Sequence, residues 1–161
     1  MTACDISEFD QLKADHARQY LDSVRAARAR LERQRQRRAE QLERMECNAP
    51  RYDGMPKNPN TYADAMTDGV IKLSAVDDSI SAAAAEWEEA ITQAVRCLDA
   101  MPNPDYSELL ERRYIDGSTW EGVAACMGMS RSWCHYSKIP ALLQLHETMP
   151  SAYRVPTLPA I

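Results

Sequence analysis

Apolar residues recur at helical spacing along most of the chain, and no stretch alternates apolar and polar positions as a strand would. One helix is predicted over residues 8–46, which contain neither proline nor glycine. Its broken apolar stripe consists of Leu12, Tyr20, Val24, Ala27, Leu31, Leu42 and Met45. Residues 48–60 hold three prolines and the pair Asp53-Gly54, so a loop is predicted there.

Residues 61–98 have the most regular periodicity of the chain, with apolar positions separated by four and three residues in turn. The positions at this spacing, all apolar except Asp77, are Met66, Val70, Leu73, Asp77, Ile80, Ala84, Trp87, Ile91, Ala94 and Leu98. Such spacing is typical of a coiled-coil seam, here with the single polar member Asp77. The seam has to be buried, and the preceding helix is the nearest partner.

Residues 1–101 are therefore predicted to form an antiparallel helical hairpin. A loop centred near residue 54 would place Asp77 beside Leu31, where Arg30 or Gln34 would satisfy its carboxylate. An alternative arrangement is a homodimer in which the two helices pair between chains.

Pro102 and Pro104 separate this hairpin from a second region, residues 102–149. Asn103 is positioned to cap a short helix whose Leu109, Leu110 and Tyr114 would face a core. Two further helices are predicted after it, which makes the expected fold class all-α. The tail, residues 150–161, holds three prolines and few apolar anchors and is expected to be disordered.

The second of these short helices is expected to begin at Ser118, because Ser118-Thr119-Trp120-Glu121 has the form of a capping box. Trp120, Val123, Ala124 and Met127 share one face of it. Gly128 follows as a favoured helix terminator, and Ser130 can cap the next helix.

In the helix that begins after Ser130, Trp133, Cys134 and Ser137 fall on one side. The outer and flanking positions are Arg131, Ser132, His135, Tyr136, Lys138 and Ile139. Arginine, serine and histidine can hydrogen-bond base edges, and tyrosine and lysine suit phosphates. The spacing fits a DNA-binding helix-turn-helix and equally fits two ordinary core helices joined by a glycine turn.

Several of these residues resemble region 4 of sigma factors: Glu111-Arg112-Arg113-Tyr114, Gly117, Trp120-Glu121, Val123-Ala124, Met127-Gly128-Met129-Ser130 and Trp133-Cys134-His135. The pattern is similar to that of small phage and prophage regulators with a sigma-region-4-like C-terminal domain, related to the RinA and ArpU late-gene regulators. This resemblance covers about 40 residues and implies major-groove recognition by the helix from Ser130. By position, the implied base contacts are Arg131, Ser132, His135 and Tyr136.

Pro140 departs from that family pattern, which carries a basic residue on a continuous helix. Proline removes a backbone hydrogen bond and costs about 3 kcal/mol inside a helix. A kink or a break is therefore expected at this position, together with the loss of a phosphate contact.

The charge of the chain argues for weak DNA binding, because the formal net charge is −5 and the pI is about 5.2. RNA polymerase or a second copy of the chain is expected to assist it. One basic block exists, with eight arginines over residues 25–44. It is either a phosphate-binding surface or, as we expect, a solvated face that pairs with acids of the next helix, namely Asp77, Asp78, Glu86, Glu88 and Glu89.

No stretch reaches the roughly 18 apolar residues of a membrane span, and the first ten residues lack the features of a signal peptide. The expected location is the cytoplasm of a bacterial host, with no membrane partner. The five cysteines include no C-x-x-C pair, so free thiols are expected, with Cys126 and Cys134 in the core. A zinc site from Cys126, Cys134, His135 and His146 has no familiar spacing, and neither metal nor cofactor is expected.

No nucleophile, phosphate loop or metalloprotease motif is present, so an enzyme is not expected. The favoured interpretation is a transcriptional regulator of phage or prophage late genes that binds double-stranded DNA. One alternative is a helical adaptor that keeps a degenerate sigma-like fold and binds protein. Another is a terminase small subunit, although those place the DNA-binding module first in the chain.

Overall fold

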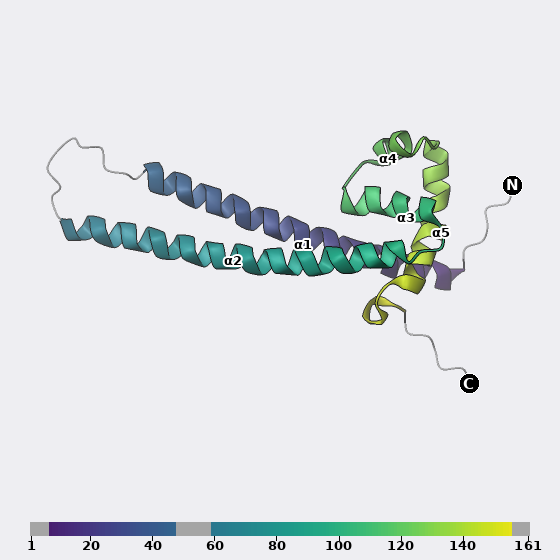
Figure 1. Ribbon diagram of the computed structural model, residues 1–161, viewed down its shortest axis with the longest axis horizontal. Helices are drawn as coiled ribbons and strands as arrows, with labels where there is room; N and C mark the ends of the chain where they lie inside the picture. The colour runs from purple at the N-terminus through teal and green to yellow at the C-terminus, as the bar shows by residue number, and fades with distance from the viewer. Residues whose placement is uncertain (1–6, 48–58, 156–161) are drawn as a thin grey trace. The chain divides into compact units, whose positions relative to one another are not determined.

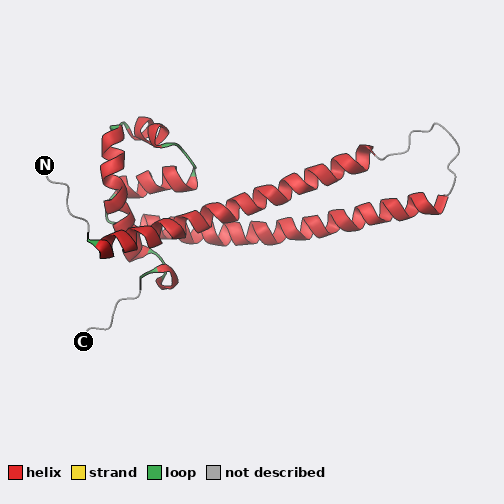
Figure 2. Cartoon of the chain, turned by 180° about the vertical axis from the view of Figure 1, so that it is seen from behind, coloured by secondary structure: helices red, strands yellow, loops and turns green. Residues whose placement is uncertain are grey.

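The computed structural model describes residues 7–47 and 59–155, with side chains of the second stretch described from Met66 onward. Every regular element in these ranges is a helix, so the fold class is all-α, as predicted (Figure 2). The elements in Figure 1 are α1 (Glu8–Cys47), α2 (Pro59–Asp99), α3 (Pro104–Leu110), the π-helical turn η1 (Glu111–Ile115), α4 (Trp120–Met127), α5 (Arg131–Thr148) and the 3-10 turn η2 (Ser151–Tyr153).

The chain divides into two compact units, and the division crosses both long helices. One unit joins the residues up to Ala26 with those from Glu89 onward, and the other holds Ala27–Glu88. This differs from the expected boundary between residues 101 and 102. In the described part of the chain, no helix combines the length and the apolarity that crossing a membrane requires.

In the unit Ala27–Glu88, α1 and α2 run antiparallel and are joined by two ion pairs. Arg38 Nε lies 2.6 Å from Asp77 Oδ1, and Arg30 Nη1 lies 2.5 Å from Glu86 Oε1. In each pair, the midpoint between the two residue numbers falls at 57.5 or 58. The turn of the hairpin was expected near residue 54, so the prediction was about four positions too early. Asp77 consequently faces Arg38 and neither Arg30 nor Gln34.

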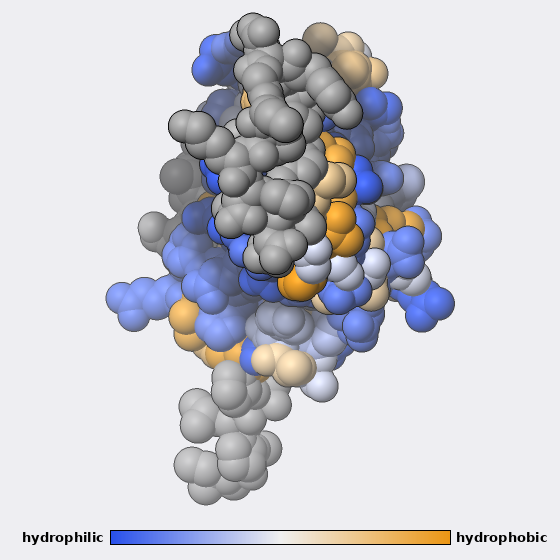
Figure 3. Space-filling model, turned by 90° about the vertical axis from the view of Figure 1, so that its left-hand side faces the viewer, coloured by the Kyte–Doolittle hydropathy of each residue, from blue (hydrophilic) through white to orange (hydrophobic). Residues whose placement is uncertain are grey.

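Near the start of α2, the buried face of the helix also departs from the predicted seam. Met66 and Val70 are 53% and 55% exposed, whereas Gly69 is buried against the side chain of Met45. Glycine has no Cβ, which lets α1 approach at this position. Exposed apolar side chains remain beside it, and Figure 3 shows patches of hydrophobic (orange) surface among the hydrophilic (blue) surface on the side that it views.

The arginines of residues 25–44 mostly have partners within the hairpin. Besides the two ion pairs with α2, Arg35 pairs with Glu32 at 3.1 Å along α1. The Arg28 guanidinium lies 6.0 Å from the centre of the Trp87 ring. These contacts fit the interpretation of the basic block as a solvated helix face.

In the other unit, the first turns of α1 and the end of α2 share a core with the C-terminal helices. Leu109, Leu110 and Tyr114 are buried, as predicted. Leu12 was expected in the apolar stripe of α1 but is 45% exposed, since the helix turns its smaller residues Ala14 and Ala17 inward. The remaining buried side chains include Leu21, Val24, Leu98, Val123, Cys134, Ala141, Leu142, Leu145 and Met149.

The tail was expected to be disordered, yet its first part, up to Val155, is ordered. Tyr153 packs on Tyr20 of α1, with ring centres 4.9 Å apart. The backbone N–H of Val155 donates to His146 Nε2 at 3.1 Å, and the Val155 side chain is buried. These anchors outweigh the proline content there, whereas residues 156–161 lie outside the described ones.

Leu142→Ala should lower the free energy of unfolding by about 2–5 kcal/mol, because it removes a fully buried side chain and leaves a cavity. Leu12→Ala, on an exposed face, should change it by less than about 0.5 kcal/mol. Urea denaturation of both variants measures the two values. Equal losses would contradict the assignment of the core.

Stability should fall as the pH drops below 6.5, because burial lowers the pKa of His146 in the folded chain. The unfolded chain then binds a proton that the folded chain resists, and protonation of Nε2 would also break the bond from Val155. Urea denaturation at pH 7.5 and 5.5 tests this, and His146→Gln should weaken the pH dependence. His135→Gln is the exposed control. The assignment to His146 would be refuted if the pH dependence of stability persisted in His146→Gln and disappeared in His135→Gln.

Candidate nucleic-acid interface

Helix α4 begins one residue later than the capping box predicted. Thr119 is its N-cap, and the Thr119 hydroxyl accepts a hydrogen bond from the backbone N–H of Gly122 at 3.1 Å. The predicted pair does not form, because the backbone N–H of Ser118 donates to the carbonyl of Arg112 at 3.0 Å and the Glu121 carboxylate pairs with Arg131. The capping box was therefore wrong in register.

The turn between α4 and α5 matches its prediction. Gly128 has φ = 64°, the left-handed conformation that glycine adopts without a steric penalty. The next N–H, from Met129, donates back to the carbonyl of Ala124 and closes the end of α4. Ser130 then caps α5 and accepts from the N–H of Trp133 at 3.1 Å.

Helix α5 has one buried face and one exposed face in its first two turns. Cys134 and Ser137 are buried. The four predicted base contacts, Arg131, Ser132, His135 and Tyr136, are all exposed, with Tyr136 at 82%. A continuous outward surface therefore follows the Ser130 cap, formed by the residues that the sequence singled out.

The predicted motif core is buried only in part. Val123, Ala124, Cys134 and Tyr114 are buried, whereas Trp120, Met127 and Trp133 are only half-buried. The Trp133 ring lies 6.4 Å from that of Tyr106 in α3. Both tryptophans therefore lie at the rim of the core, where part of each ring can meet solvent.

An ion pair lies on the exposed surface where α4 meets α5. Arg131 Nη1 is 2.9 Å from Glu121 Oε1, and both side chains are about two-thirds exposed. Glu121 thus holds the arginine that begins α5. Exposed pairs of this kind contribute about 0–1 kcal/mol, so a competing acceptor can displace Glu121.

Lys138 was predicted on the DNA-facing side, but it is half-buried and packs on Trp120. Its Nζ lies 5.7 Å from the centre of that ring. Burial lowers the pKa of Lys138, and the charges of Arg18 and Arg113 lower it further, against a smaller opposing effect of Asp15. Lys138 therefore belongs to a cluster of cations beside the exposed face of α5.

Two members of that cluster were not identified from the sequence. Arg113 extends from η1 with its guanidinium carbon 5.1 Å from the centre of the Trp120 ring. Arg18 comes from α1, more than a hundred residues before Lys138. Arg113 lies within the motif that resembles sigma factors, which was a usable signal, whereas no local pattern marks Arg18.

Pro140 neither breaks α5 nor ends it. The helix runs without interruption from Arg131 to Thr148. The turn after the proline buries Ala141, Leu142 and Leu145, and this burial compensates for the missing backbone hydrogen bond. Residues on both sides of Pro140 therefore belong to one helix.

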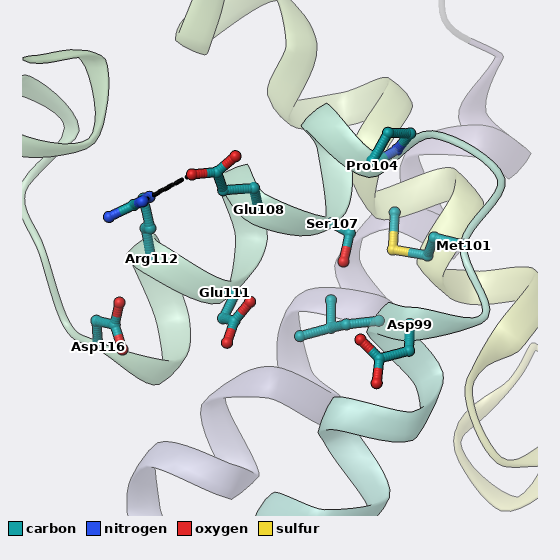
Figure 4. A pocket seen from close by; sticks show the side chains of 9 residues that line it. Asp99, Met101, Pro104, Ser107, Glu108, Glu111, Arg112 and Asp116 are labelled. Carbon is teal, nitrogen blue, oxygen red and sulfur yellow. Dashed lines mark hydrogen bonds and ion pairs between the residues drawn. The ribbon is translucent and has the colours of Figure 1, made fainter. Parts of the chain in front are cut away.

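A pocket of about 470 Å³ lies where the end of α2 meets α3 and η1 (Figure 4). Its wall is acidic, because Asp99, Glu108, Glu111 and Asp116 line it. Arg112 is the one basic residue of the lining, and its Nη2 lies 2.7 Å from Glu108 Oε1. Phosphates would be repelled here, so the pocket is not part of a DNA-binding surface.

The cysteines differ in their environments. Cys134 is buried, as expected, but Cys126 is exposed because it lies on the outer face of α4. Within residues 7–47 and 59–155, no three histidine, cysteine or acidic side chains gather as metal ligands would.

Comparisons with family models, with curated proteins and with solved structures found no match to this chain.

Ser130→Ala should lower the free energy of unfolding by about 1 kcal/mol, because the N–H of Trp133 would lose its side-chain acceptor. Ser132→Ala is the matched control two residues later, where the side chain is exposed and caps nothing. Thermal unfolding should detect a loss for the first variant and almost none for the second. Similar melting temperatures would contradict the assigned start of α5.

Proposed function

We propose that this protein is a DNA-binding transcription regulator whose helix α5 enters the major groove of DNA. The observation that carries the proposal is the composition of the outward face of α5. Arg131, Ser132, His135 and Tyr136 are exposed together, directly after the Ser130 cap, on a helix held by α3 and α4. In helix-turn-helix proteins, this N-terminal part of the second helix contacts base edges.

The chemistry of this face suits base recognition. Arginine binds the O6 and N7 atoms of guanine with two hydrogen bonds, which contribute about 1–3 kcal/mol of discrimination. This exceeds the roughly 0–1 kcal/mol of the exposed pair with Glu121, so Arg131 can exchange its partner on binding. His135 lies one turn further along the same face and extends the contact.

The resemblance to sigma region 4 supports regulation of phage or prophage genes, with RNA polymerase as a further partner. The charge balance supports the need for assistance, since a chain with a formal net charge of −5 gains little from non-specific attraction to DNA. A second copy of the chain, joined through the hairpin, would double the contacts.

Arg131→Ala and His135→Ala should each weaken binding to a preferred duplex about 5- to 150-fold, the equivalent of about 1–3 kcal/mol. The duplex is obtained by selection from a random-sequence pool on the full chain, and affinity is measured by fluorescence anisotropy at low salt. Arg37→Ala, an exposed arginine of α1, is the control and should bind as the unchanged chain does. No enrichment of any sequence, with or without polymerase, would contradict the proposal and favour a protein-binding adaptor.

Glu121→Gln should strengthen DNA binding up to about fivefold, because it releases Arg131 and removes a negative charge from the bound surface. Glu43→Gln makes the same change in net charge on an exposed position of α1 and is the matched control. Anisotropy at several salt concentrations separates the two. An equal gain in both variants would assign the effect to net charge alone and contradict the role of Glu121.

A further inference from the structure

Trp120 is the centre of a small group of basic side chains beside α5. The Arg113 guanidinium carbon and Lys138 Nζ lie 5.1 and 5.7 Å from the centre of its ring. The His135 ring lies 6.0 Å away and connects the group to the exposed face of α5. A tryptophan face attracts cations, so one ring holds two of them in place.

A further positive charge that acts on Lys138 comes from Arg18 of α1. Its charge lies near enough to lower the pKa of Lys138, after burial and together with Arg113. Arg18 Nε is buried and has no hydrogen-bond partner among the described residues. Because Nε is enclosed, it is not open to a ligand, and Arg18 contributes its charge from beside buried Tyr114.

The group carries more positive than negative charge. Asp15 lies 3.5 Å from Arg18 Nη1 and is the acid that acts on Lys138. Arg113 donates to the carbonyl of Ser118, and no carboxylate among the described residues lies within ion-pair distance of Arg113 or Lys138. Arg113 and Lys138 lie against one ring and repel each other, and an anion placed between them would relieve that repulsion.

We propose that Arg113 and Lys138, which lie against the Trp120 ring, together bind a phosphate group of the DNA backbone, next to the base-reading face of α5. The proposal rests on the function proposed above and adds a contact that α5 alone does not supply. Arginine grips phosphate through two parallel hydrogen bonds, and lysine adds a compact charge. Trp120 holds both of these cations before DNA arrives.

The position of the group along α5 fits this role. Lys138 follows Arg131 by seven residues, which is about 10 Å along the helix axis. The major groove is about 12 Å wide. When the first turn of α5 lies against base edges, the group is thus near the phosphates at the edge of the groove.

The test measures how Arg113→Gln and Lys138→Gln change affinity for a selected duplex and for a scrambled duplex of equal length. Each variant should lose roughly tenfold on both duplexes at low salt. The slope of log affinity against log salt should become shallower by about one. Arg37→Gln is the matched control and should change neither value. Unchanged affinity and slope in both cluster variants would overturn the proposal.

A second measurement uses the unchanged chain and so does not depend on whether the variants fold. The pKa of Lys138 is followed by carbon NMR of its side chain, alone, with the selected duplex and with inorganic pyrophosphate. A bound phosphate should raise the pKa of Lys138 towards its ordinary value. A duplex that binds without raising it would overturn the phosphate site and leave the DNA function standing. A rise with pyrophosphate in a chain that binds no duplex would support a phosphate site and contradict the DNA function.

Discussion

The burial of one stripe of α5 is the constraint on which the rest of the C-terminal region depends. Cys134, Ser137, Ala141 and Leu145 follow one another at intervals of three or four residues and are all buried. A helix that buries this stripe has no rotational freedom about its axis. Arg131, Ser132 and His135 must then point outward, whatever their function. The surface proposed to meet DNA is thus set by the core beneath it.

The same stripe explains why Pro140 is tolerated and why the start of α1 matters. The residues after the proline contribute much of the burial, so the helix gains more by continuing than by ending. Contacts from α1 reach the same region, through His16 Nδ1 at 3.1 Å from the carbonyl of Tyr153 and through Lys13 near Glu147. The C-terminal helices and the base of the hairpin therefore form one compact unit, which includes both Arg18 and Lys138.

Local signals predicted local structure well. The Ser130 cap, the left-handed Gly128 and the two faces of α5 depend on neighbours within a few residues, so the sequence around them was sufficient. The start of α4 shows the limit of such signals, because Ser118 and Thr119 are both good caps. Thr119 is the cap in the structure, and the N–H of Ser118, which a capping box at Ser118 would need, instead donates to the carbonyl of Arg112 in the preceding turn.

Features that depend on distant parts of the chain were not predictable in this way. The pairing of Arg38 with Asp77 follows from the register of two long helices, and a shift of four residues in the loop centre changes every partner. Lys138 belongs to the outer face by helical spacing, yet packing on Trp120 and the approach of Arg18 place it among other cations. The order of the tail likewise depends on Tyr20 of α1, which no pattern near Tyr153 indicates.

The central claim is that the outward face of α5 contacts DNA, and amide NMR spectra of the full chain, titrated with a selected duplex, test it most directly. If α5 contacts DNA in this way, the largest shifts fall on residues 131–136, with smaller ones around Arg113 and Lys138. Shifts confined to the arginine-rich residues 25–44, with α5 unaffected, would contradict it.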